Sequence, residues 1–178
     1  MDRYKKYAII IQLFSYVIIF VDVVLTTSHW LLPRVYSALY NATGLTVTRQ
    51  FDVIGFSLGQ KLSGFIVEAF ATALLVYGLV LVIQLMNYLK KKQYFTSETI
   101  TLLKKITKIS LIYTVYSVVC SSILSVITSL QNKPGERMIS IGFGTLDVIN
   151  IMMFCCLFLV LTIFQKGYEL KHEQELTI

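Results

Sequence analysis

Four long apolar runs alternate with shorter polar segments along the chain. They cover residues 7–30, 62–88, 109–130 and 139–164. A helix needs about 20 mainly apolar residues to cross about 30 Å of membrane hydrocarbon, and each run is long enough. The sequence therefore predicts an all-α fold with one domain over residues 1–178, an integral membrane four-helix bundle of four transmembrane helices.

The composition excludes a typical soluble domain. Of the 178 residues, 56% are hydrophobic, and the mean hydropathy is +0.70. A soluble domain of this length carries more polar surface. The net charge of +6 comes from Lys and Arg beside the apolar runs, so we interpret it as a topology signal and expect no direct nucleic-acid binding.

The basic residues predict the direction of the chain across the membrane. On one side lie Arg3, Lys5, Lys6, Lys90, Lys91, Lys92, Lys104, Lys105, Lys108, Lys166 and Lys171, and on the other Arg34, Arg49, Lys61, Lys133 and Arg137. The side richer in Lys and Arg is the cytoplasmic one. We therefore expect both termini in the cytoplasm, an outer loop over residues 31–61, a cytoplasmic elbow over 89–108 and a cytoplasmic tail over 165–178.

The elbow contains a helix start. Thr96 or Ser97 can cap a helix that has Glu98 in its first turn, and apolar residues then follow at helical spacing. The third helix is therefore predicted to begin near Ser97 and to enter the membrane near residue 109.

Three of the apolar runs contain one carboxylate each, namely Asp22, Glu68 and Asp147. Counted from the run ends at 1.5 Å per residue, all three lie about 10–12 Å below the outer surface. The third run has no acid but supplies hydroxyls at this depth. The candidate polar or cation site comprises Asp22, Glu68, Asp147, Ser121, Ser125 and Asn150.

Two interpretations of this polar set are open. Three carboxylates so close together need protonation, a metal ion, Lys61 or a protonated His29 to balance their charge. In one interpretation they hold the helices together through interhelical hydrogen bonds. In the other they form a proton or cation site that opens to the outside, with the metal unspecified.

No sequence pattern is typical of an enzyme. Cys120, Cys155 and Cys156 lie inside apolar runs, and the chain has no C-x-x-C motif. His29 and His172 are predicted on opposite sides of the membrane, so they cannot share a metal site within one subunit. We expect no enzymatic activity, no catalytic residue and no cofactor.

The last residues, IFQKGYELKHEQELTI, contain the pattern F-x-x-G-x-x-L-x-x-E-x-x-L-T-I. Its fixed positions are Phe164, Gly167, Leu170, Glu173, Leu176, Thr177 and Ile178, and the elbow sequence YFTSETITLLKKI adds Phe95, Thr96 and Glu98. Together with the four spans, these segments resemble a family of small bacterial inner-membrane proteins of unknown function. The resemblance implies a bacterial inner (plasma) membrane location. Its members are often encoded beside a small helix-turn-helix regulator, which implies a cytoplasmic partner of that kind.

The tail has a pattern of its own. Gly167 is expected to relax or end the fourth helix just inside the membrane. Beyond it, Leu170, Gln174 and Ile178 fall at i, i+4 and i+8 and predict a short amphipathic segment. This segment could dock on the basic elbow of its own chain or bind a partner.

These features favour a non-enzymatic protein of the lipid bilayer that acts as a regulatory or interaction partner, that is, a membrane anchor or sensor. A homo-oligomer is a further option. The alternative function is a small oligomeric proton- or cation-coupled transporter that uses the carboxylates.

Overall fold

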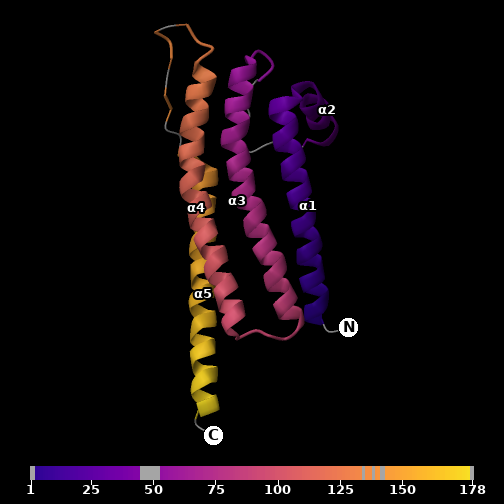
Figure 1. Ribbon diagram of the computed structural model, residues 1–178, viewed down its shortest axis with the longest axis vertical. Coiled ribbons are helices and arrows are strands. Elements are labelled where there is room, and N and C mark those ends of the chain that lie inside the picture. Colours follow the sequence, from indigo (N-terminus) through magenta and orange to yellow (C-terminus); the bar gives the residue numbers. More distant parts are fainter. Residues whose placement is uncertain (1–2, 45–52, 134, 138, 141–142, 177–178) are drawn as a thin grey trace.

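The computed structural model of the protein describes residues 3–44, 53–133, 135–137, 139–140 and 143–176. Its helices are α1 (Arg3–Leu31), α2 (Pro33–Thr43), α3 (Leu58–Lys90), α4 (Ser97–Ser129) and α5 (Thr145–Leu176) (Figure 1). All except α2 are long and apolar enough to cross a membrane. The predicted all-helical membrane fold with four spans is confirmed.

The four long helices pack in chain order. α1 packs on α3, α3 on α4, and α4 on α5, while no Cα atom of α1 lies within 8 Å of one in α4 or α5 within the described ranges. Both ends of the chain and the α3–α4 turn lie at one end of the molecule, which we call the turn end (Figure 1). The opposite end, with α2 and the α4–α5 connection, is the loop end. The bundle is therefore an open row in which only consecutive long helices have closely approaching backbones.

α5 is displaced along its axis toward the turn end. Near its start, Asp147 contacts Ser117 in the middle of α4, and near its other end Gly167 contacts Phe95, two residues before α4 begins. Tyr168 and Glu169 still lie against the start of α4, and the last residues of the helix, 170–176, extend about 10 Å beyond the turn at 1.5 Å per residue (Figure 1). We call these residues the projecting segment.

The fourth helix begins later than the apolar run from residue 139 predicted. The chain before Thr145 runs beside α4, where the Ser125 hydroxyl donates to the carbonyl of Ser140 at 3.1 Å and accepts from its amide at 3.0 Å. These hydrogen bonds satisfy the backbone at Ser140 outside a helix.

Local signals set the starts of α3 and α4. Ser57 and Gln60 form a capping box at the start of α3. Thr96 caps α4, and its hydroxyl accepts from the amide of Thr99 at 3.3 Å. The predicted helix start near Ser97 is confirmed.

Buried apolar side chains form two separate clusters. The turn-end core contains Leu81 and Leu85 of α3, Ile100, Leu102, Leu103 and Ile106 of α4, and Leu161 of α5. The loop-end core contains Trp30, Val53, Phe56, Cys120, Leu124 and Ile127. Because lipid tails are as apolar as these side chains, close packing and polar contacts hold the row together inside a membrane.

Candidate functional site

The carboxyl group of Glu68 is buried at the α1–α3 interface near the loop end. The indole Nε1 of Trp30 donates a hydrogen bond to Glu68 Oε2. Trp30 is fully buried, and a Cβ atom on Gly64 would lie 2.2 Å from its ring. The absence of a side chain at Gly64 therefore lets the ring lie flat against α3 and reach Glu68.

His29 lies beside Trp30 and is also buried, with 1% of its surface exposed. Its ring meets Trp30 and Tyr36 edge to face, at centroid distances of 5.3 Å and 4.8 Å. Neither ring nitrogen has a hydrogen-bond partner among the described residues. The imidazole therefore packs as an aromatic ring between α1 and α2 and does not balance the charge of Asp22.

Asp22 lies deeper along the same interface, beside the hydroxyl of Thr72. Thr72 in turn shares a 3.2 Å hydrogen bond with Thr26. One carboxyl oxygen of Asp22 is buried without a hydrogen-bond partner in the part of the chain that the structure describes.

Asp147 lies in a different interface, between α4 and α5. Its Oδ1 accepts from the Ser117 hydroxyl at 2.6 Å, and its Oδ2 accepts from the amide of Gly144 at 2.9 Å. The second contact satisfies a backbone amide at the start of α5. Asp147 therefore fixes both the beginning of α5 and its register on α4.

The remaining members of the predicted polar set do not converge on one point. The backbone carbonyl of Asn150 accepts from Thr114 at 3.5 Å. Ser125 holds the α4–α5 connection at Ser140, and Ser121 lies half-buried on α4 between Ser125 and Ser117.

The three predicted carboxylates do not meet in one cluster, and their common depth in a membrane stays a prediction. Asp22 lies beside Thr72, one turn of α3 from Glu68, whereas Asp147 lies on α5, which α3 and α4 separate from α1. No group of three or more His, Cys, Asp or Glu residues within the described ranges could hold a metal ion. Depth counted along the sequence does not specify which helices are neighbours, and the helices form a row in which α1 and α5 are not adjacent.

The second predicted set of residues meets at the turn end. The rings of Phe95 and Phe164 lie 5.4 Å apart, and a Cβ atom on Gly167 would lie 2.4 Å from the Phe95 ring. Thr96 caps α4 directly after Phe95. The elbow and the tail are therefore joined by one aromatic contact, which we call the Phe95 joint.

The prediction that Gly167 ends the fourth helix is wrong. α5 continues through Gly167 to Leu176 without a break. Because Gly167 has no side chain, the Phe95 ring can pack directly against α5. This packing favours a helical conformation at Gly167.

The projecting segment carries the other tail residues. Leu170 is 59% exposed and Glu173 is exposed. Leu176 is the last residue of α5, and Thr177 lies outside the described residues.

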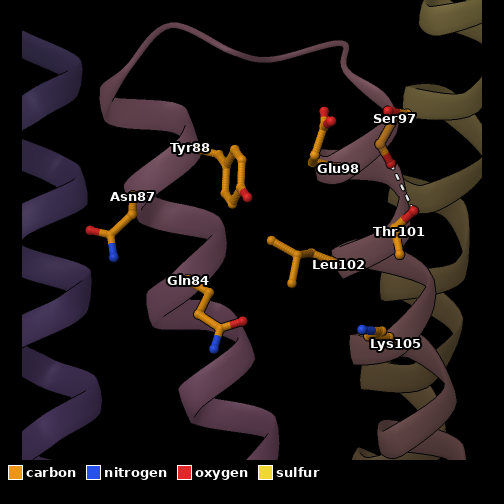
Figure 2. Close-up of a pocket in the computed structure, with 8 residues that line it drawn as sticks. All are labelled: Gln84, Asn87, Tyr88, Ser97, Glu98, Thr101, Leu102 and Lys105. Atoms are coloured by element: carbon orange, nitrogen blue, oxygen red, sulfur yellow. Dashed lines mark hydrogen bonds between the residues drawn. The ribbon is translucent and has the colours of Figure 1, made fainter.

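Two grooves flank the start of α4. The larger, with a volume of about 610 Å³, lies between α3 and α4. It is lined by Gln84, Asn87 and Tyr88 of α3 and by Ser97, Glu98, Thr101, Leu102 and Lys105 of α4 (Figure 2). The smaller, about 330 Å³, lies between α4 and α5 and includes Lys104 and Glu169.

Sequence reasoning missed the contact between α1 and α3 at the turn end. The Gln12 amide donates to the carbonyl of Ile83 at 3.0 Å and to the Asn87 side chain at 2.8 Å, and the Lys90 ammonium donates to Gln12 Oε1. The sequence feature that could have indicated this contact is Gln12 itself, because it is an uncharged polar residue within an apolar run.

Comparison with known proteins identifies the family without assigning a function. No curated protein and no solved structure shows significant similarity to the chain. A family model described as "Protein of unknown function (DUF2975)" matches residues 58–178, which include α3, α4, α5, the Phe95 joint and both grooves. Because this match covers more than half of the chain, the protein belongs to the DUF2975 family of proteins of unknown function.

Proposed function

We propose that the protein is a non-enzymatic membrane anchor or sensor that presents the projecting segment to a cytoplasmic protein partner. The positive-inside rule supports a cytoplasmic turn end. The lysines of the α3–α4 turn (Lys90, Lys91, Lys92) and those near the start of α4 (Lys104, Lys105, Lys108) lie at that end.

The observation that carries this proposal is the Phe95 joint. Phe95 packs on Phe164 and in the space left by Gly167, so α5 is fixed to the start of α4 just before it leaves the row. The projecting segment beyond it remains helical and exposes Leu170 between charged residues. A short helix with an exposed apolar side chain is suited to an apolar groove of a partner.

The first tail residues pack on the elbow of the same chain, since Gly167 contacts Phe95 and Glu169 lines the smaller groove with Lys104. Docking of the tail on the end of α3 at Lys90 has less support. α5 has no Cα atom within 8 Å of α3, the helix that ends at Lys90, and Lys90 contacts Gln12 of α1. Within α5, Lys166 pairs with Glu169 at 2.7 Å.

The transporter alternative has less support. Asp22 and Glu68 lie at different levels of the α1–α3 interface, and Asp147 lies between α4 and α5. Each of these three carboxylates contacts a side chain of the adjacent helix. Such contacts support a role in holding pairs of helices together.

The test is to identify what contacts Leu170 in the native membrane. A photo-reactive residue at position 170 is expected to cross-link one protein in stoichiometric amount, whereas the same residue at Met152, 62% exposed on the apolar part of α5, should capture lipid. Leu170→Glu should lower recovery of the partner about tenfold, since loss of a central apolar contact has effects of this size. The amount of the variant in the membrane should not change.

Two results would contradict the proposal. One is equal recovery of the same proteins after Leu170→Glu or after removal of residues 170–178. The other is a cross-link from position 170 only to a second copy of this chain, which would indicate a homo-oligomer.

A further inference from the structure

The α3–α4 groove combines one negative and one positive side chain on the same helix face. Glu98, Thr101, Leu102 and Lys105 occupy positions i, i+3, i+4 and i+7 of α4, which lie on one side of a helix. From α3, Tyr88 points across the groove toward Leu102 (Figure 2). The groove therefore has an apolar floor, since Leu102 is buried, and charged groups toward both of its ends.

The two charges lie in a fixed order along the membrane normal. Glu98 is in the first turn of α4, where the helix N-terminus favours a carboxylate. Lys105 is seven residues, or about 10 Å, further along the helix. Because the apolar part of α4 follows Lys105, the negative group lies nearer the water and the positive group nearer the hydrocarbon.

We propose that this groove binds the headgroup of a phospholipid that carries a primary amine, such as phosphatidylethanolamine. In a bilayer the ammonium group of this lipid lies outermost and its phosphate lies deeper, next to the glycerol. The order of charges in the groove is complementary, with Glu98 toward the ammonium and Lys105 toward the phosphate. The carboxamide of Gln84, which lines the groove closer to Lys105 (Figure 2), can donate a further hydrogen bond to the phosphate.

The charge order also distinguishes this lipid from other ligands. A free phosphate ion would gain nothing from Glu98, and a phosphatidylglycerol headgroup would place neutral hydroxyl groups there, without the attraction that an ammonium group gains from the carboxylate. A choline headgroup is cationic but has no N–H group to donate to the carboxylate. The inference is independent of any protein partner at Leu170, because this groove is lined by residues of α3 and α4, whereas Leu170 lies on α5.

The test is lipid retention measured by native mass spectrometry. The full chain, in mild detergent, is given equal amounts of phosphatidylethanolamine, phosphatidylcholine and phosphatidylglycerol with the same acyl chains. We expect the wild type to retain the ethanolamine lipid about fivefold over the other two, a preference of the size that an exposed ion pair supplies. Glu98→Gln should remove the preference, and Glu98→Asp, which keeps the charge, should restore part of it.

Lys105→Gln should instead lower retention of all three lipids, because each has a phosphate. The matched controls are Lys104→Gln, since Lys104 lines the smaller groove, and Glu169→Gln on α5. Neither control should change lipid retention or preference.

The proposal is overturned if the wild type shows no preference for the ethanolamine lipid, if Glu98→Gln keeps that preference, or if Lys104→Gln acts as strongly as Lys105→Gln. Displacement of the retained lipid by an equal concentration of soluble glycerophosphoethanolamine would assign the groove to a free metabolite and would overturn the lipid assignment.

Discussion

Two glycines, Gly64 and Gly167, each lie against an aromatic ring from another element. A Cβ atom would meet the Trp30 ring at 2.2 Å in the first case and the Phe95 ring at 2.4 Å in the second. Gly55, Gly59 and Ser63 are small residues four apart that lead into the same helix, yet a Cβ atom on Gly59 would have nothing within 4 Å. Small residues at helical spacing mark a surface for close approach, but they do not show which of them a large side chain will meet.

Gly64→Ala is expected to destabilise the protein by about 1–3 kcal/mol, the usual cost of overpacking. The Trp30 ring cannot move aside easily, because it is fully buried and bonded to Glu68. The measurement is reversible unfolding in mixed detergent micelles. Gly59→Ala is the control and should unfold as the wild type does or slightly later. Equal stability of the two variants would show that Trp30 has room to shift.

At the scale of the elements, a helix start set by residues within one turn could be predicted, and one set by contacts across a connection could not. The start of α4 follows from Thr96 and Glu98, which act within one turn. The late start of α5 could not be predicted, because the contact between Ser125 and Ser140 joins segments across a turn. α2 was missed although Pro33 at its first turn and Gly44 after its last are typical boundary residues.

Gly167→Ala tests the Phe95 joint at this scale. Alanine favours a helix over glycine by about 1 kcal/mol, so α5 itself should not weaken. The Cβ atom should instead displace Phe95 and expose the turn around Lys92. The measurement is the rate of proteolysis at this turn in proteoliposomes, which we expect to rise several-fold.

The double variant Gly167→Ala with Phe95→Ala provides the control for this experiment. If the two sites act through the same contact, the double variant should be cut no faster than Phe95→Ala alone. Proteolysis of Gly167→Ala at the wild-type rate would contradict the assignment of the joint.

At the scale of the whole molecule, the row separates sites that the sequence alone suggested were together. The four spans and their composition were predictable, because length and hydropathy decide them. The grouping of Asp22 with Asp147 was not, because depth within a span does not specify which helices are neighbours. The turn-end residues Phe95, Phe164 and Gly167 were identified through a family resemblance, and their contact with one another became evident only in the structure.

A double-mutant cycle between Asp22→Asn and Asp147→Asn tests this separation. Their effects on the free energy of unfolding should add to within about 0.5 kcal/mol, as for sites with no shared partner. A shared cation or proton would instead give a coupling of about 0.5–3 kcal/mol. The cycle is best repeated with and without a chelator, which should leave the wild type unchanged.

The two attachments of α5 to α4 have a mechanical consequence. Asp147 and Gly167 are separated by 20 residues of helix, or about 30 Å, which is close to the thickness of the hydrocarbon layer. A helix held at two points this far apart cannot tilt by itself to match a thinner or thicker bilayer. A change in bilayer thickness must therefore reorient α4 and α5 as one unit, and the projecting segment would move relative to α1 with them.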